Sequence, residues 1–485
     1  MENKELEKFH EQLQKSKVAV IGLGVSNIPL IKYLKNLNVD ITVFDNRSLE
    51  KIDNDIIKYL RENNIIGNFG DEYLKKLKGF DIIFRSPSCR PDVQEVLEEK
   101  KRGAIVTTEI EMVIKLCPGK VIGITGSDGK TTTTSLVYEI LKKAKYNCYL
   151  GGNIGIPLFD KIHEMKKEDI VVLELSSFQL MDMEVSPNIS VITNITPNHL
   201  DIHKSYEEYI ESKKNIFKFQ KEDDVLVLNY NDEIVNKFEN EAKGKVVFFS
   251  KESKLENGVM LNDDLIKFAE NGIRRQLLNV KDVKLRGRHN FENICTAIAA
   301  TLGLANFEIA TDAVKEFKGV EHRIEFVREI GGVKWYNDSI GSSPTRTIAG
   351  LNSFNEDIVL IAGGYDKHLD YEPIARPILQ NVSKLILLGQ TAPKIEKAVK
   401  DAVLELKGKV IVENGCQLLK FNLNNKEKEI KLFNVQTLEE TVEFAYKKAI
   451  KGEVVLFSPA SASFDMFKNF MERGEKFKKL VNDII

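Results

Sequence analysis

A glycine-rich stretch at residues 123–132, Gly-Ile-Thr-Gly-Ser-Asp-Gly-Lys-Thr-Thr, combines residue types that can bind phosphate. An apolar run precedes it at 120–124, and a helical pattern follows it at 133–143. In a turn from a strand to a helix, backbone N–H groups and the helix N-terminus can hold phosphate oxygens. We therefore expect Lys130 to reach the terminal phosphates of a nucleotide and the hydroxyl of Thr131 to hold Mg²⁺.

This stretch departs from the strict phosphate-loop pattern at one position. The pattern requires a glycine where Ile124 stands, and the glycines fall at 123, 126 and 129 instead. A plain tight turn between a strand and a helix is the alternative interpretation. The run Gly-Lys-Thr-Thr at the start of a helix favours the phosphate loop.

Two further residues have the chemistry to complete a magnesium site. Glu174 closes an apolar stretch and is followed by Leu-Ser-Ser, so it could hold Mg²⁺ beside bound phosphates. A surface glutamate is the alternative. Tyr209 and Lys213 are spaced i, i+4 and share one face of a predicted helix. Because other lysines flank this pair, a solvated helix face is the alternative there.

The polar segment 194–203 contains His199, Asp201 and His203 within five residues. Such a triplet could suggest a metal, but a zinc site needs further ligands. We expect the segment to line a cleft for phosphate, Mg²⁺ or substrate.

The front of the chain has part of a dinucleotide-binding pattern. A buried strand at 17–21 leads into the turn Gly22-Leu-Gly24, and the next strand ends in Asp45. An acidic residue about twenty positions after the glycines belongs to the Rossmann fingerprint, but Asn27 stands where the third glycine is expected. NAD, another nucleotide or diphosphate, and a unit without ligand all stay open.

Polar clusters follow three predicted strands near the C-terminus, at 337–339, 363–367 and 458–465. In an open α/β sheet, ligands bind at the carboxyl ends of the strands. Any one cluster could be an ordinary loop, but three at corresponding strand ends favour a cleft. Ser86 follows a similar strand near the front, where a plain strand-to-turn exit is the simpler interpretation.

The composition is that of a globular protein with ample core, since 42% of the 485 residues are hydrophobic and 29% are charged. The net charge of −2 gives no basic surface for nucleic acid or membrane. The 5 cysteines form no CxxC pair, which argues against zinc and disulfides and for a reducing, cytoplasmic environment. We expect neither a signal peptide nor a membrane span.

Strands alternate with helices along the whole chain, which predicts an α/β fold with three domains in series. We place a Rossmann-like domain at 1–107, a P-loop ATPase-type domain at 108–319 and a second Rossmann-like domain at 320–485. This alternation is interrupted at 251–280, where we predict an irregular polar stretch with a hairpin.

These motifs resemble, over essentially the full length, the Mur ligase family, and within it the ligases that add D-glutamate. The resemblance rests on the motifs already described and on the following further runs: Gly-Arg-His-Asn at 287–290, His-Arg at 322–323, Asn-Asp-Ser at 337–339 and Ser-Pro-Ala-Ser-Ala-Ser-Phe-Asp-Met-Phe at 458–467. The front domain and this last run favour the D-glutamate enzymes over their relatives.

The resemblance implies an ATP-dependent ligase that adds D-glutamate to UDP-N-acetylmuramoyl-L-alanine through an acyl phosphate, in peptidoglycan precursor synthesis. It implies ATP and two Mg²⁺ ions as cofactors and a monomer that inserts into no membrane and binds no nucleic acid. The three domains would hold the UDP-substrate, ATP and the amino acid in turn.

The resemblance also implies roles for single residues. Residues that would bind ATP are Gly126, Ser127, Asp128, Gly129, Lys130, Thr131, Thr132, Asn293, Arg323 and Asp338. Residues that would bind the UDP-substrate are Gly24, Val25, Ser26, Asp45, Arg47, Ser86, Asn153 and His199. Residues that would bind the amino acid are Lys367, Ser463 and Phe470.

The implied catalytic residues are Lys130, Glu174, His199 and Lys213, and the implied Mg²⁺ ligands are Thr131, Glu174 and Lys213. Lys213 would act as a carbamate, because a bare ammonium has the wrong charge beside Mg²⁺ whereas a carbamate is an oxygen ligand.

Three positions depart from the pattern of the family. Asp128 stands where asparagine is usual, Ser88 where glycine is usual, and the run at 340–343 lacks a familiar lysine. Two other functions stay open. One is a related ligase for a different amino acid or acceptor, and the other is a nucleotide-binding regulatory protein that forms no bond.

Overall fold

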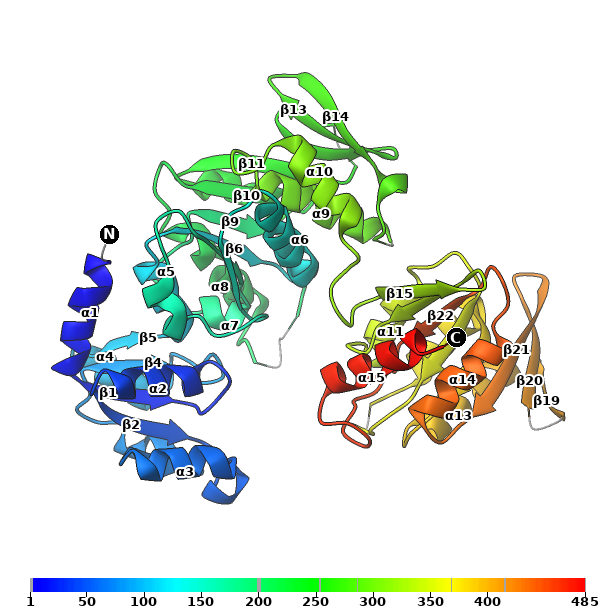
Figure 1. Ribbon diagram of the computed structural model, residues 1–485, viewed down its shortest axis with the longest axis horizontal. Helices are drawn as coiled ribbons and strands as arrows, with labels where there is room; N and C mark the ends of the chain where they lie inside the picture. Colours follow the sequence, from blue (N-terminus) through cyan, green and yellow to red (C-terminus); the bar gives the residue numbers. More distant parts are fainter. Residues whose placement is uncertain are drawn as a thin grey trace. The chain divides into compact units, whose positions relative to one another are not determined.

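The computed structural model describes residues 3–198, 202–252, 254–285, 287–367, 369–413 and 416–484. The strands of these residues form three sheets of five, nine and eight strands, in chain order (Figure 1). The chain divides into two compact units, one of residues 1–283 and 291–316 and one of 284–290 and 317–485. The first unit holds the first two sheets. The division into domains at 107 and 319 stays a prediction.

The first sheet has the strand order β3-β2-β1-β4-β5 and is parallel throughout. Its strands are β1 (Lys17–Ile21), β2 (Asp40–Asp45), β3 (Ile66–Phe69), β4 (Ile82–Arg85) and β5 (Ile105–Thr107). Its helices are α1 (Lys4–Gln14), α2 (Asn27–Asn36), α3 (Asn54–Glu62) and α4 (Gln94–Lys101), with 3-10 turns η1 (Leu49–Lys51) and η2 (Tyr73–Lys76). The strand order reverses between β1 and β4, where this fold class forms its ligand crevice.

The second sheet has the order β14-β13-β12-β11-β10-β9-β6-β8-β7. Its strands are β6 (Lys120–Thr125), β7 (Cys148–Gly152), β8 (Ile170–Glu174), β9 (Ile189–Ile192), β10 (Val225–Asn229), β11 (Lys245–Ser250), β12 (Gly258–Asn262), β13 (Leu265–Glu270) and β14 (Ile273–Asn279). The stretch predicted to be irregular contains the expected hairpin, but β12 also joins the sheet in parallel with β11.

The helices of this region are α5 (Glu109–Leu116), α6 (Lys130–Lys143), α7 (Ser177–Leu180), α8 (Tyr206–Lys218), α9 (Arg288–Ala300) and α10 (Phe307–Glu316). Its 3-10 turns are η3 (Phe159–Glu164), η4 (Asn236–Glu241) and η5 (Val280–Asp282). Phe159 of η3 packs its ring against Phe9, Tyr33 and Phe84 of the first sheet's region, with centroids 6.5, 5.3 and 6.2 Å apart. The first two sheets therefore share one hydrophobic core.

The third sheet has the order β15-β16-β22-β17-β18-β21-β20-β19. Its strands are β15 (Glu325–Ile330), β16 (Val333–Asn337), β17 (Ile358–Ala362), β18 (Val382–Leu387), β19 (Lys409–Glu413), β20 (Cys416–Leu423), β21 (Lys426–Asn434) and β22 (Val454–Phe457). Its helices are α11 (Pro344–Leu351), α12 (Glu372–Asn381), α13 (Ala392–Glu405), α14 (Leu438–Lys448) and α15 (Phe470–Asn482).

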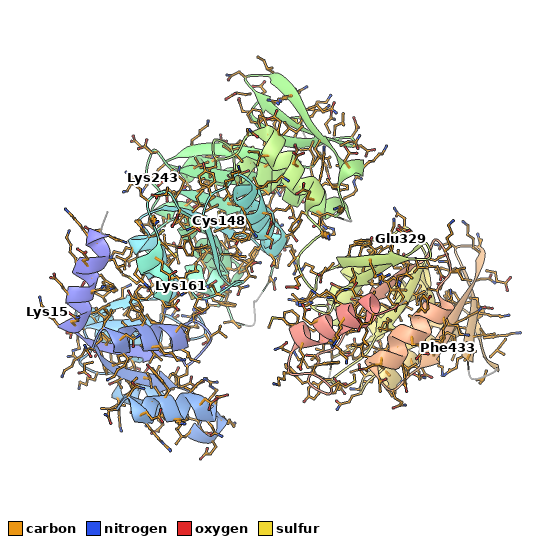
Figure 2. All side chains as sticks on the ribbon, in the orientation of Figure 1. Lys15, Cys148, Lys161, Lys243, Glu329 and Phe433 are labelled. Atoms are coloured by element: carbon orange, nitrogen blue, oxygen red, sulfur yellow. The ribbon has the colours of Figure 1, made fainter. Side chains whose placement is uncertain are left out.

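The strands β16, β22 and β17 are parallel neighbours. Their carboxyl ends therefore meet at one edge of the sheet, which confirms that the three polar clusters near the C-terminus lie together. Apolar side chains form the core on both faces of the sheet. Figure 2 draws the side chains of the chain as sticks on the ribbon. Among the described residues, no helix combines the length and the apolar content needed to cross a membrane.

Candidate active site

The glycine-rich loop connects β6 to α6, as predicted. Gly126 has φ +151° and Gly129 has φ +79°, a region of backbone conformation that favours glycine. A Cβ atom on Gly126 would lie 1.8 Å from Thr193 Oγ1, and one on Gly129 would lie 2.3 Å from Asn293 Oδ1. These two glycines allow the loop to pack closely on the end of β9 and on α9. Ile124, by contrast, is a fully buried core residue of β6.

The end of β9 holds the loop by hydrogen bonds. The N–H groups of Ser127 and Asp128 donate to the carbonyl oxygen and to Oδ1 of Asn194, at 2.9 and 2.8 Å. Thr193 Oγ1 donates to the carbonyl oxygen of Asp128 at 2.6 Å. The loop is thus fixed through its backbone, while the Asp128 side chain is exposed to solvent.

Two lysine ammonium groups lie against this loop. Lys130 Nζ donates to the carbonyl oxygens of Gly126 and Ser127, at 2.8 Å each. Lys213 Nζ, from α8, donates to the same Gly126 oxygen at 2.8 Å and to Thr125 Oγ1 at 3.2 Å. The Lys213 side chain is almost fully buried, and its burial and the nearby charge of Lys130 hold its pKa well below the usual value.

Glu174 lies next to the loop because β8 pairs with β6, with Glu174 opposite Ile124. Its Oε1 accepts a hydrogen bond of 2.7 Å from Asn153 Nδ2. Its Oε2 is buried and has no hydrogen-bond partner among the described residues. An unpartnered buried carboxylate oxygen is costly, and a bound cation would satisfy it. The residues around the loop therefore fit a Mg²⁺ ion.

The carboxyl ends of β1, β2 and β4 carry most of the residues predicted to bind the UDP-substrate. Asp45 Oδ2 accepts from the N–H of Leu23 at 2.7 Å, and both its oxygens accept from Arg47 at 2.8 Å. Burial alone would raise the pKa of Asp45, but the hydrogen bonds and charge of Arg47 hold it below the usual value. A Cβ on Gly22 would lie 2.6 Å from Ser86 Oγ, so the two turns pack together.

The turn of Gly24, Val25 and Ser26 follows at this edge, where Val25 is 80% exposed and Ser26 is half-buried. Ser26 precedes α2 without capping it. Asn153, from the end of β7, lies instead beside Glu174 in the second sheet. His199 falls outside the described residues, so its predicted role stays a prediction.

The second unit joins two of its three polar clusters, 337–339 and 458–465, through Asp338 and Arg473. Asp338 is buried after β16, and its Oδ2 accepts from Ser458 Oγ at 2.6 Å. Burial raises the pKa of Asp338 to about 6. Arg473, which the sequence did not single out, donates to the carbonyl oxygens of Ser339 and Ala462, at 2.8 Å each.

The residues predicted to bind the amino acid lie at the same edge of this sheet. The N–H of Tyr365 donates to the carbonyl oxygen of Ala462 at 2.9 Å, which places the loops of Lys367 and Ser463 side by side. Lys367 is exposed, and its Nζ lies 5.5 Å from the centre of the Phe464 ring.

The chain resembles known proteins in both sequence and structure. Residues 124–301 match the family model of the Mur ligase middle domain, and residues 322–461 match that of the Mur ligase glutamate ligase domain. A UDP-N-acetylmuramoylalanine--D-glutamate ligase of Acetivibrio thermocellus is 48% identical over 482 residues, covering 99% of both chains. One of Clostridium botulinum is 48% identical over 479 residues, covering 98% of each. The chain belongs to the Mur ligase family.

Solved structures agree with the fold of this Mur ligase. A pseudomurein peptide ligase type C from Methanothermus fervidus has a TM-score of 0.52 and 19% identity, covering 97% of this chain and 100% of that one. MurF ligase from Thermotoga maritima, in complex with ADP, has a TM-score of 0.51 and 20% identity, covering 85% and 91%. At these identities the likeness concerns the fold alone, and it confirms the predicted α/β class.

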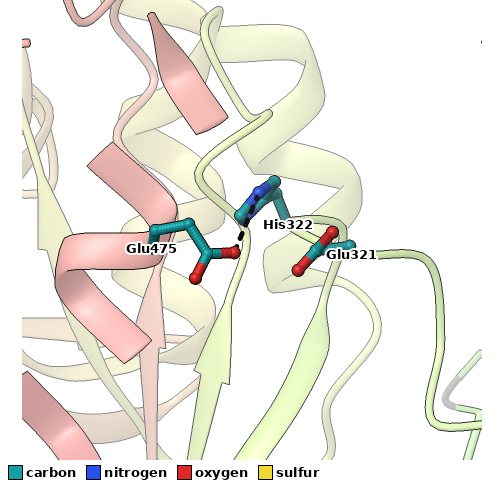
Figure 3. A group of neighbouring side chains, drawn as sticks. All are labelled: Glu321, His322 and Glu475. Carbon is teal, nitrogen blue, oxygen red and sulfur yellow. Dashed lines mark ion pairs between the residues drawn. The ribbon is translucent and has the colours of Figure 1, made fainter. Parts of the chain in front are cut away.

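A second group of potential metal ligands in this Mur ligase lies far along the chain, at Glu321, His322 and Glu475 (Figure 3). His322 Nε2 lies 3.8 Å from Glu475 Oε1. Lys478 Nζ already lies 2.5 Å from Glu321 and 2.8 Å from Glu475. Because an ammonium neutralises these carboxylates, we interpret the group as an ion-pair network on the surface of the second unit.

Proposed function

We propose that this Mur ligase uses ATP to join D-glutamate to UDP-N-acetylmuramoyl-L-alanine, in the synthesis of peptidoglycan precursors. The names and the 48% identity of its relatives support the reaction. The observation that carries the proposal in the structure is the grouping of Lys130, Lys213 and the unpartnered Glu174 oxygen around one phosphate loop.

The chemistry explains why these residue types are needed. A carboxylate is a poor electrophile, so the terminal phosphoryl group of ATP is first transferred to the L-alanine carboxylate. The amine of D-glutamate then attacks the carbonyl carbon of this acyl phosphate, phosphate leaves and an amide forms. Charge neutralisation and positioning supply most of the acceleration in phosphoryl transfer.

The roles follow from the placement of the side chains. Lys130 neutralises phosphate charge beside the loop, while Thr131 and Glu174 would hold Mg²⁺, which screens the charges of the transferring phosphoryl group. Lys213 would serve as a carbamate, since a buried lysine with a depressed pKa is available as the neutral amine that reacts with CO₂. Two Mg²⁺ ions would share these ligands.

The remaining ligand contacts are proposals of the same kind. Asn293 already touches the phosphate loop and would contact ATP, and the proposed ATP contacts also include Arg323 and Asp338. The turn at 24–26, with Asp45, Arg47, Ser86, Asn153 and His199, would bind the UDP-substrate. Lys367, Ser463 and Phe470 would bind D-glutamate. We also propose a cytoplasmic monomer that binds no nucleic acid.

Phosphate release tests the proposal most directly. The assay contains UDP-N-acetylmuramoyl-L-alanine, ATP and Mg²⁺, and amino acids are supplied one at a time. We expect release with D-glutamate to exceed that with L-glutamate or L-alanine by at least about 100-fold, the scale of a missing charge-assisted contact. Equal rates with the three amino acids would contradict the proposed specificity.

A further inference from the structure

Arg90, in the loop after β4, connects the first sheet to helix α8 of the second. Its NH1 and NH2 donate to Oε2 and Oε1 of Glu208, at 3.2 and 2.6 Å. NH1 also donates to the carbonyl oxygen of Ile202 at 2.9 Å, and Asp92 holds the other edge of the guanidinium at 2.8 and 3.0 Å. Arg90 thus fixes α8 and the segment before it by bidentate, charge-assisted bonds.

Glu208 also contacts the segment that precedes α8. Its Oε2 also accepts from the N–H of Lys204 at 2.8 Å and lies 3.4 Å from His203 Nδ1. The pairing is partly shielded from water, since the side chains of Arg90 and Glu208 are 22% and 27% exposed. Such a shielded bidentate pair holds its geometry better than a pair on the open surface.

His203 links the segment before α8 to helix α7 and to Tyr209, which contacts the phosphate loop. Its ring is buried, stacks on Phe178 with centroids 5.1 Å apart, and meets Tyr209 edge to face at 5.3 Å. His203 Nε2 lies 2.9 Å from Ser177 Oγ, at the start of α7. The Tyr209 hydroxyl in turn lies 2.8 Å from Ser127 Oγ in the phosphate loop.

We propose that Arg90 is a positioning residue for ligation: through Glu208 and His203 it holds α8, and therefore Lys213, in place against the phosphate loop. Glu208 and Lys213 share α8, and Lys213 Nζ reaches the Gly126 carbonyl oxygen at 2.8 Å. Arg90 also follows Ser86 closely in the loop at the UDP-substrate edge, so the same residue joins the substrate crevice to the ATP site. The inference rests on the proposed function of that site.

The chain offers a matched control for this test. Lys100 also bridges the two sheets, with Nζ 3.2 Å from Asp182 and 3.4 Å from Glu184, and both of these partners lie outside α8. Loss of a bridge between the sheets is therefore common to Arg90→Ala and Lys100→Ala, whereas displacement of α8 is expected only for Arg90→Ala.

Five variants are assayed for kcat, KM and the Mg²⁺ concentration that gives half the maximal rate. They are Arg90→Ala, Arg90→Lys, Glu208→Gln, Lys100→Ala and the double variant Arg90→Ala/Glu208→Gln. For Arg90→Ala we expect kcat to fall about 100-fold, as for a misplacement of about 1 Å, and the Mg²⁺ requirement to rise. The KM for D-glutamate should stay within twofold. Arg90→Lys should recover little, because lysine lacks the bidentate fork.

The double variant should be no slower than the worse single variant, since the two residues act as a unit. Lys100→Ala should keep kcat within twofold. A folded Arg90→Ala variant with a kcat near wild type would overturn the proposal, as would an equal loss in Lys100→Ala. If Arg90→Ala does not fold, Glu208→Gln tests the positioning role instead, because glutamine keeps the volume of the side chain. A wild-type kcat in Glu208→Gln would also refute the role.

Calorimetric titration with Mg²⁺–ATP separates this proposal from the proposed function. We expect Arg90→Ala to bind Mg²⁺–ATP at least about tenfold more weakly than wild type and Lys100→Ala to bind it normally. A wild-type protein that binds Mg²⁺–ATP but releases no phosphate with D-glutamate would contradict the function alone. Unchanged Mg²⁺–ATP binding in Arg90→Ala would contradict the positioning role alone.

Discussion

Lys213 Nζ donates a hydrogen bond of 2.8 Å to the carbonyl oxygen of Gly126, which joins helix α8 to the phosphate loop. The two residues are 87 positions apart in the sequence. The lysine is 1% exposed, and its ammonium also lies 4.8 Å from the ring centre of Tyr209. A lysine buried in this way against the glycine-rich loop fits the role that we propose for Lys213 in ligation.

Replacement of Lys213 by alanine is expected to abolish ligation, with a loss of at least about 1,000-fold. The physical reason is the loss of the carbamate on Lys213, the oxygen ligand that we propose for Mg²⁺ at the phosphate loop. Acetate or formate at high concentration should restore part of the rate, because a small carboxylate can occupy the space of the carbamate. Steady-state phosphate release with and without the carboxylate measures both effects.

Lys214→Ala is the matched control for that experiment. Lys214 is the next residue of α8, but its Nζ pairs with Glu211 at 3.1 Å and Glu241 at 2.5 Å, away from the loop. Its replacement should leave kcat within twofold and give no response to acetate. Full activity of Lys213→Ala would exclude a metal-ligand role for Lys213.

Gly126→Ala should weaken ATP binding while the rest of the fold remains intact. The new Cβ would meet Thr193 Oγ1 at 1.8 Å, and φ +151° is unfavourable for alanine. A strained position of this kind costs about 1–3 kcal/mol, so we expect Kd for ATP to rise roughly 5- to 150-fold. Isothermal titration with ATP and Mg²⁺ measures the change.

Gly70→Ala is the control for Gly126→Ala, because it introduces backbone strain without a steric conflict. Gly70 has φ +86°, but nothing lies within 4 Å of its added Cβ. The variant should lose some thermal stability and bind ATP like wild type. Equal ATP affinities for Gly126→Ala and wild type would show that the loop can rearrange freely.

Because of Glu109, the free energy of unfolding of the first unit should fall as the pH rises from 4.5 to 7. Burial raises the pKa of Glu109 from its usual 4.5 to about 7, although Oε1 accepts the N–H groups of Leu158 and Phe159 at 3.1 and 2.9 Å. In this range the folded state binds a proton that the unfolded state has released. The contribution of Glu109 to the free energy of unfolding is therefore fully present below pH 4.5 and is lost as the pH rises through 7.

Glu109→Gln should remove this dependence, because an amide oxygen still accepts both N–H groups and carries no charge. At pH 8 the variant should exceed wild type in stability by on the order of 3 kcal/mol, and at pH 5 the difference should largely vanish. Urea unfolding at pH 5, 6, 7 and 8 measures the difference in free energy of unfolding between the variant and wild type at each pH. A difference that does not grow with pH would refute the raised pKa.

Lys367→Ala should raise the KM for D-glutamate and leave the KM for ATP unchanged. A charge-assisted hydrogen bond contributes about 1.5–3 kcal/mol, which corresponds to roughly 10- to 150-fold in KM. Lys394→Ala is the control, because Lys394 pairs with Asp366 at 2.6 Å, next to Lys367 in the chain. Similar KM values for Lys367→Ala and Lys394→Ala would contradict the contact with substrate.

Local patterns predicted the elements that carry the site. The apolar run before Gly126, the glycines and the helical pattern after Lys130 correspond to β6, the loop and α6, since backbone preferences and burial act over a few residues. The polar stretch after 251 was harder to predict. The strand β12 forms because it pairs with β11 and the hairpin, a tertiary effect that local composition does not express.

The amino-acid sequence by itself determined the α/β class, the phosphate loop and the residue types that could hold phosphate and Mg²⁺, because these depend on short-range spacing and on the chemistry of each side chain. Only the tertiary structure decided that Lys213, and not the neighbouring Lys214, is buried against Gly126. It also paired Arg90 with Glu208 across 118 positions. Strand order and helix packing bring such residues together, and no local pattern records which distant side chains will meet.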